Sequence, residues 1–85
     1  IMKKVKYNNK IILMPFDDMA IYEPINELVN VSNRFNGNSV EIPNFALSVY
    51  DLIMGSEMLN QWDKHAKGLS WFRKHFPKEY MILLD

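Results

Sequence analysis

The chain contains no cysteine, so its 85 residues must fold without disulfide bridges and without thiolate-bound metal ions. A chain of this length forms one domain at most and buries about two thirds of its surface in a single modest core. Hydrophobic residues make up 48% and charged residues 24% of the sequence, which indicates a folded protein rather than a disordered one. We therefore expect one small domain over residues 1–85, whose limited core favours self-association.

The first half of the chain predicts a β-hairpin followed by a helix. Asn8 and Asn9 tolerate the positive φ values of a two-residue turn, so residues 4–13 are typical of a hairpin. Pro15 is expected to end the second strand, because proline cannot donate a hydrogen bond to a neighbouring strand. Residues 24–35 predict a helix, since a proline suits the first helical position and apolar residues follow at helical spacing.

The second half predicts mainly helices. One helix is expected to start at Pro43 or Asn44, and Gly55 either lies inside a long helix or separates two helices. Helical spacing continues to Gly68, and a short helix is expected over residues 69–76. Residues 79–84 fit a strand or a helix. The strand is preferred, because a two-stranded hairpin alone is marginal. The predicted fold is α+β: a small single domain with an N-terminal β-hairpin, extended or not by a third C-terminal strand, packed with three to four helices.

The net charge is zero, but the charges are unevenly distributed along the chain. Residues 1–10 hold four lysines and no acid, residues 11–57 hold seven acids and one arginine, and residues 58–85 hold five basic residues and three acids. Either the basic ends neutralise the acidic middle, within one molecule or between copies, or they face an anionic partner.

No catalytic motif is present in the sequence. It lacks a glycine-rich phosphate loop, a nucleophile elbow and a cysteine nucleophile. His65 and His75 are ten residues apart, without the spacing of a zinc motif. Asp17 and Asp18 follow a predicted strand, where capping of a following helix is a more common role than acid–base chemistry. We therefore expect a protein that is not an enzyme and has no cofactor and no metal.

The closing segment combines aromatic and basic residues. At helical spacing Leu69, Phe72 and Phe76 share one face, whereas Trp71, Lys74 and His75 form a ridge on the opposite side. Either this ridge is also buried, between the core and the last segment, or it is an interface. The candidate interaction residues are Lys64, Lys67, Trp71, Arg73, Lys74, His75 and Lys78. Such a surface suits an acidic protein, a second copy of this chain, or single-stranded nucleic acid.

The N-terminal segment has the basic start of a signal peptide but not its apolar part. Its apolar run extends only from Ile11 to Met14, whereas a secretory signal needs about 7–15 apolar residues and a membrane span about 20. We therefore expect a cytoplasmic protein that does not enter a membrane.

Two segments of the C-terminal half, "PNFALSVYDLIMGSE" (Pro43 to Glu57) and "GLSWFRKHFPKEYMILLD" (Gly68 to Asp85), support a resemblance. They resemble small uncharacterised proteins of bacteriophages and mobile elements from AT-rich bacteria. The resemblance implies no activity, cofactor or catalytic residue. It implies a protein that binds, blocks or modifies a host or phage complex.

These observations favour a non-enzymatic interaction protein that binds another protein and associates with itself into a homo-oligomer. The alternative is an accessory nucleic-acid-binding protein that uses the basic and aromatic C-terminal region. The neutral overall charge argues against this alternative, because nucleic-acid-binding domains are usually clearly basic.

Overall fold

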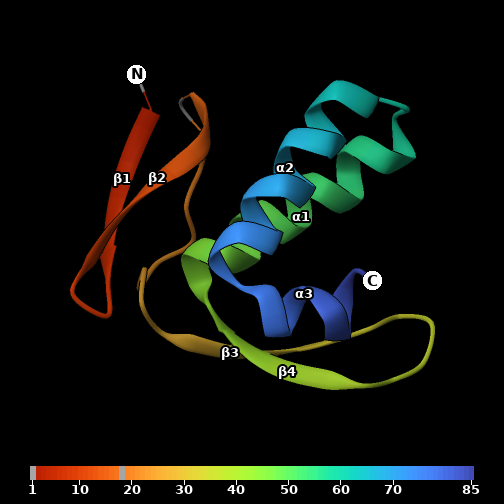
Figure 1. Cartoon of the computed structure of the whole chain (residues 1–85), viewed down its shortest axis with the longest axis horizontal. Helices are drawn as coiled ribbons and strands as arrows, with labels where there is room; N and C mark the ends of the chain where they lie inside the picture. Colours follow the sequence, from red (N-terminus) through yellow and green to blue (C-terminus); the bar gives the residue numbers. More distant parts are fainter. Residues whose placement is uncertain (1, 18) are drawn as a thin grey trace.

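The computed structural model describes residues 2–17 and 19–85. Its elements, in chain order, are β1 (Met2–Tyr7), β2 (Lys10–Asp17), β3 (Leu28–Ser32), β4 (Ser39–Pro43), α1 (Asn44–Met58), α2 (Trp62–His75) and α3 (Pro77–Leu83). The strands form two separate antiparallel hairpins, β1–β2 and β3–β4. Hairpin β1–β2 lies at one end of the molecule beside α2, and β3–β4 runs along α1 and α3 (Figure 1). The predicted α+β class is confirmed.

The first hairpin follows the prediction closely. Asn8 and Asn9 have φ values of 50° and 63°, as a tight two-residue turn requires. The prediction that Pro15 ends the second strand is wrong, because β2 continues to Asp17. In β2, Ile12 pairs with Val5 across the turn, so the backbone of every second residue from Ile11 faces the free edge. Pro15 lies beyond Leu13, where the register shifts between the pairs Lys4–Leu13 and Met2–Asp17, and a β-bulge is a place where a strand accommodates a proline.

The helix predicted over residues 24–35 is wrong, because this segment contains a turn and strand β3. Strand β3 pairs with β4, with Val29 opposite Ile42 and Val31 opposite Val40. Both valines are half-buried while the residues between them are exposed, which is the period of two of a strand. The β-branched side chains fit this pleated surface better than a helix. The partner strand β4 begins at Ser39, so only residues 33–38 connect the two strands.

The helices start where prolines and asparagines suggest, but they end elsewhere. α1 begins at Asn44, as predicted, and runs through Gly55 to Met58. The chain then reverses at Asn60, whose φ is 56°. Gly68 does not end a helix: it lies in the middle of α2, where a Cβ atom would come within 2.6 Å of a side-chain carbon of Ile53 in α1. Gly68 thus permits the close approach of α1 and α2. No helix in the described part of the chain is long and apolar enough to cross a membrane.

The third strand preferred for residues 79–84 is also wrong. This segment forms α3, which begins with Pro77 at its first position. Instead of extending β1–β2, it packs against β4 and α2. Two hydrogen bonds hold its end, because the buried Asn33 side chain donates to the carbonyl oxygens of Ile82 and Leu83, at 2.9 and 3.5 Å.

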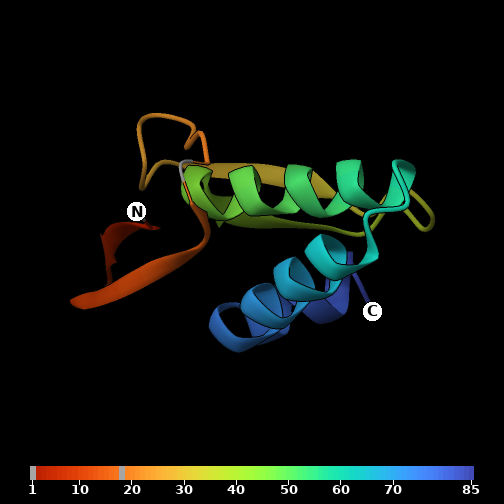
Figure 2. The ribbon, with the colours of Figure 1, turned by 90° about the horizontal axis from the view of Figure 1, so that it is seen from above.

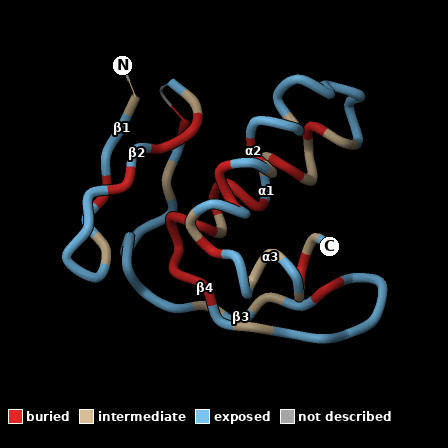
Figure 3. Tube along the Cα trace, in the orientation of Figure 1, coloured by how far each residue is buried: buried red, intermediate tan, exposed pale blue. Residues whose placement is uncertain are grey.

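The core lies where α1, α2 and the two hairpins meet (Figure 3). Its centre is aromatic, with Phe45, Phe72 and Phe76 stacked at ring distances of 5.7 Å for two pairs. Seen from above, α1 separates the segment that precedes β3 from α2 on the other side (Figure 2). The total exposed surface of 5564 Å² is close to the roughly 5,300 Å² expected for a folded monomer of this mass. A single copy therefore exposes about as much surface as an ordinary folded monomer.

Candidate functional site

One face of α2 carries three lysines and a tryptophan towards the first hairpin. Lys64, Lys67, Trp71 and Lys74 follow at spacings of three and four residues, which places them on one helix face. The ammonium groups of Lys64 and Lys67 both lie 5.7 Å from the ring centre of Phe16 in β2. This face therefore lies toward β2, although its three lysines are exposed to solvent.

Trp71 is buried between this face and the core. Only 7% of it is exposed, and its ring packs against Phe45, Phe72 and Phe76. Its indole N–H donates a hydrogen bond of 2.8 Å to the carbonyl oxygen of Leu13, at the free edge of β2. Of the two alternatives left by the sequence, burial is thus the one found for Trp71. The covering element is the first hairpin, and not the last segment of the chain.

A groove of about 400 Å³ lies between β2 and α2. It is lined by Met2, Ile11, Leu13, Met14, Pro15, Lys67, Trp71, Lys74 and His75, and we call it the hairpin–helix groove. Its volume lies within the range of ligand pockets, roughly 300–1,000 Å³. Ile11 and Leu13 are 66% and 48% exposed there, although both are large aliphatic residues. The groove thus offers apolar contact area that this chain itself does not cover.

Basic groups surround these apolar side chains. Lys4 pairs with Leu13 and Lys6 with Ile11, so both lysines lie on the same outer face of the hairpin as the two aliphatic residues. On the opposite wall Lys67 and Lys74 line the groove directly. The basic start of the chain and its basic helix therefore meet at one place, which the charge distribution along the sequence could not reveal.

His75 stands at the junction of this groove with a smaller hollow of about 160 Å³, which Lys10 and Lys74 also line. Its ring lies 5.0 Å from that of Trp71. Burial, and then the positive charges of Lys74 and Lys10, hold the pKa of His75 below its ordinary value of 6.5. At neutral pH it is therefore an uncharged, half-buried wall of the groove.

The structure divides the candidate residues into two groups. Lys67, Trp71, Lys74 and His75 line the groove, and Lys64 lies beside them over Phe16. Arg73 points elsewhere, with its guanidinium 5.9 Å from the ring centre of Tyr80 in α3. Lys78 is exposed on α3 and is not part of the groove lining. Helical spacing predicted Trp71, Lys74 and His75 of the α2 wall, whereas the hairpin wall was not predicted. A signal for that wall was the run of aliphatic residues at successive positions of an edge strand.

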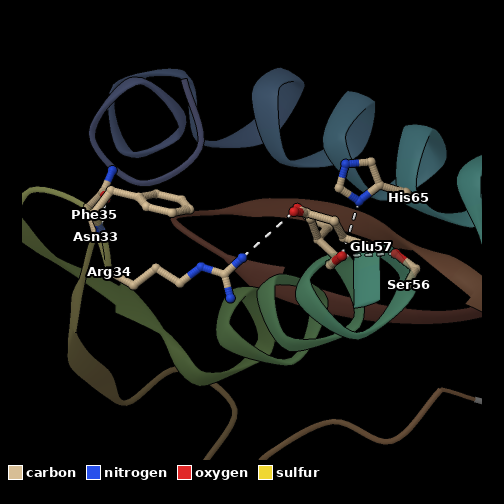
Figure 4. A network of polar contacts seen from close by, with 7 residues as sticks. Asn33, Arg34, Phe35, Ser56, Glu57 and His65 are labelled. Carbon is tan, nitrogen blue, oxygen red and sulfur yellow. Dashed lines mark hydrogen bonds and ion pairs between the residues drawn. The ribbon is translucent and has the colours of Figure 1, made fainter. Parts of the chain in front are cut away.

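A second polar cluster lies at the far end of the molecule, where the β3–β4 turn meets α1 (Figure 4). Arg34 and Glu57 approach to 3.7 Å, and His65 donates from Nδ1 to the carbonyl oxygen of Ile53, at 3.1 Å. Asn33 accepts hydrogen bonds from the amides of Phe35 and Asn36, which shapes the turn. These contacts tie the turn, α1 and α2 together, and the adjoining hollow of about 150 Å³ is small. We interpret this cluster as structural.

The histidines and carboxylates of the described residues are too dispersed to form a metal-binding cluster. Among residues 2–17 and 19–85, no group of three or more histidines and carboxylates is placed to hold a metal ion. Asp17 lies at the end of β2, and residues 19–27 form no helix that it could cap, so the predicted capping role is wrong for Asp17. Asp18 lies outside the described residues. The expectation of a non-enzymatic protein without a cofactor stays a prediction.

Comparison with known proteins adds no functional assignment. The resemblance to small phage and mobile-element proteins is therefore a prediction that rests on the residues quoted for it, and the function must be argued from the groove itself. No protein-family model, no curated protein and no solved structure matches this chain.

Proposed function

We propose that the protein is a non-enzymatic interaction protein that binds the acidic surface of a partner protein through the hairpin–helix groove and also associates with itself. The observation that carries this proposal is the meeting of exposed Ile11 and Leu13 with lysines from both ends of the chain. Exposed aliphatic residues grouped in a groove are typical of interaction sites. The surrounding lysines add selectivity for negative charge and speed the encounter with an acidic partner.

The composition of the groove favours a protein over a nucleic acid as partner. Nucleobases bind by stacking on exposed aromatic rings. Trp71 has only 7% of its surface exposed, and its polar N–H is already used by Leu13. The exposed apolar groups are aliphatic instead, and these match the aliphatic side chains of a protein.

Affinity capture with two matched double variants tests the proposal. The double variant Lys67→Glu with Lys74→Glu reverses the charge of the two lysines that line the groove. The double variant Arg73→Glu with Lys78→Glu changes the net charge by the same amount at positions away from the groove. A tagged protein is incubated with a lysate of an AT-rich Gram-positive bacterium after nuclease treatment. We expect a stoichiometric protein that binds the unchanged chain and the Arg73/Lys78 variant but not the groove variant. Equal capture by both variants would contradict the groove as the binding site.

The alternative, an accessory nucleic-acid-binding protein, is favoured by one specific observation. Lys10 from the hairpin and Lys74 from α2 line the same hollow, so the two basic segments form one positively charged region. Binding of a fluorescent single-stranded oligonucleotide would then weaken steeply with salt, with a log–log slope of about −0.7 for each phosphate contacted. An oligonucleotide that fails to bind at low salt would exclude this alternative.

The resemblance to phage and mobile-element proteins supports a narrower form of the proposal. In this form the protein modulates a host or phage complex in the bacterial cytoplasm. The identity of the captured protein tests it directly, because a component of the replication, transcription or defence machinery is expected rather than a metabolic enzyme.

A further inference from the structure

The segment before and into β3 has the chemistry that the hairpin–helix groove lacks. We call residues 22–28 the acidic turn. Within it Glu23 and Glu27 are exposed, and neither forms an ion pair within the described part of the chain. Ile25 and Leu28 are 36% and 49% exposed beside them. Two unpaired carboxylates and two free aliphatic side chains thus stand together on one short segment.

Hydrogen bonds hold the acidic turn rigidly against the start of α1. The carbonyl oxygens of Pro24, Ile25 and Glu27 accept from Asn44 Nδ2 and from the amides of Phe45 and Asn44, at 3.0, 3.1 and 2.9 Å. At its other end the amide of Tyr22 donates to the Ser48 hydroxyl, and the Tyr22 hydroxyl donates to Asp51. A segment whose backbone is fixed in this way loses little conformational entropy when its side chains dock.

The acidic turn cannot fill the groove of its own molecule. Asn26 donates to the carbonyl oxygen of Lys6, at the β1 edge of the hairpin, whereas the groove opens along the β2 edge beside α2. In Figure 2 the segment before β3 and helix α2 lie on opposite sides of α1. The two surfaces therefore face different directions, and a contact between them joins two molecules head to tail.

We propose that the hairpin–helix groove of one copy binds the acidic turn of a second copy, with Ile25 and Leu28 against Ile11 and Leu13. This inference rests on the proposed function, because it names the occupant of the same groove. Charge complementarity carries it. The lysines around the groove (Lys4, Lys6, Lys67 and Lys74) meet Glu23 and Glu27, which form no ion pair with any described residue of their own molecule. One turn in one groove is a small interface, so the association is reversible and sensitive to salt.

Complementary variants test this arrangement. The groove variant, Lys67→Glu with Lys74→Glu, keeps its turn, and the turn variant, Glu23→Lys with Glu27→Lys, keeps its groove. Sedimentation velocity across a concentration series in low salt should show self-association of the unchanged protein, weakened at least about tenfold in either variant. Mixing the two variants should restore one contact and produce a 1:1 dimer that grows no further.

Controls separate this result from general attraction between oppositely charged proteins. Arg73→Glu with Lys78→Glu and Glu41→Lys with Glu79→Lys change the net charge equally, away from both surfaces, so each should associate like the unchanged protein. Circular dichroism checks that all four variants fold. A monomeric unchanged protein, self-association retained by both test variants, or no dimer in their mixture would overturn the head-to-tail contact. In those cases the self-association fails, but the binding of a partner protein through the groove still stands if the groove variant alone loses the captured protein. If that capture is unaffected, partner binding through the groove fails too.

Discussion

The two hairpins share one topology but differ in what they show to solvent. In β3–β4 the inner positions hold Val29, Val31 and Ile42 against the helices, and the outer positions are polar, such as Asn30 and Glu41, except for Leu28 at the start of β3. In β1–β2 the inner positions are equally apolar, but two of the outer positions hold Ile11 and Leu13. A strand that only supports the core needs apolar residues on one face. The additional aliphatic face of β1–β2 therefore points to binding rather than to stability.

Isoleucine truncation in each hairpin gives the largest expected contrast. Ile42 is completely buried, so Ile42→Ala should lower the free energy of unfolding by about 2–5 kcal/mol. Ile11 is 66% exposed, so Ile11→Ala should lower it by less than about 0.5 kcal/mol while weakening groove binding. Urea denaturation measures both effects. A similar loss of stability in the two variants would show that the outer face of β1–β2 belongs to the core after all.

The hairpins also differ in how far the sequence could predict them. Asn8-Asn9 specifies a tight turn by its own backbone preference, so β1–β2 is visible locally. In residues 24–35 the apolar residues fit the spacing of a helix as well as the alternating pattern of a strand. The segment forms a strand because it pairs with β4, which a local pattern does not reveal. The helix over residues 79–84 also escapes local prediction, because the hydrogen bond from Asn33 that holds the end of α3 is a tertiary contact.

Of the two walls of the groove, only the wall formed by α2 could be predicted from the sequence. Helical spacing placed Trp71, Lys74 and His75 on one ridge, and all three line the groove. However, the partner of the Trp71 indole is Leu13, 58 residues away in the sequence. Local pattern carries no information on a contact at that separation, so the hairpin wall and the burial of Trp71 both required the structure.

Two glycines in the helices offer a matched pair that tests how closely α2 must pack against α1. In Gly68→Ala the new Cβ atom would meet Ile53, so α2 must shift away from α1, at a cost of about 1–3 kcal/mol. In Gly55→Ala the Cβ atom meets nothing within 4 Å, and the substitution should stabilise α1 by roughly 0.5–1 kcal/mol. Thermal unfolding distinguishes the two signs. If Gly68→Ala were neutral, the close contact between α1 and α2 would not be needed.

Trp71→Phe tests the attachment of β1–β2 to α2 without removing the aromatic packing. It deletes the hydrogen bond to Leu13 and should lower the free energy of unfolding by about 0.5–1.5 kcal/mol. Because this bond joins only the first hairpin to α2, hydrogen exchange should accelerate most in the amides of β1–β2. Equal acceleration in β3–β4 would mean that the two hairpins open together and that the bond has no local role.

The smallest expected effect is the pH dependence of the free energy of unfolding that comes from His75, a residue beside hairpin β1–β2. Because the pKa of folded His75 is lowered, first by burial and then by Lys74 and Lys10, the unfolded chain binds this proton more readily than the folded protein. The free energy of unfolding should therefore decrease as the pH falls below about 6.5, and level off once folded His75 is protonated as well. Urea midpoints between pH 7.5 and 5 measure this, and His75→Gln should flatten the profile. An unchanged profile in that variant would assign the effect to another group.

The carboxylates of a docked acidic turn would favour protonated His75. Self-association should therefore strengthen over the same pH interval in which the folded state becomes less stable. A groove that binds an acidic partner predicts that self-association strengthens while the free energy of unfolding decreases. A purely structural histidine predicts only the decrease in the free energy of unfolding.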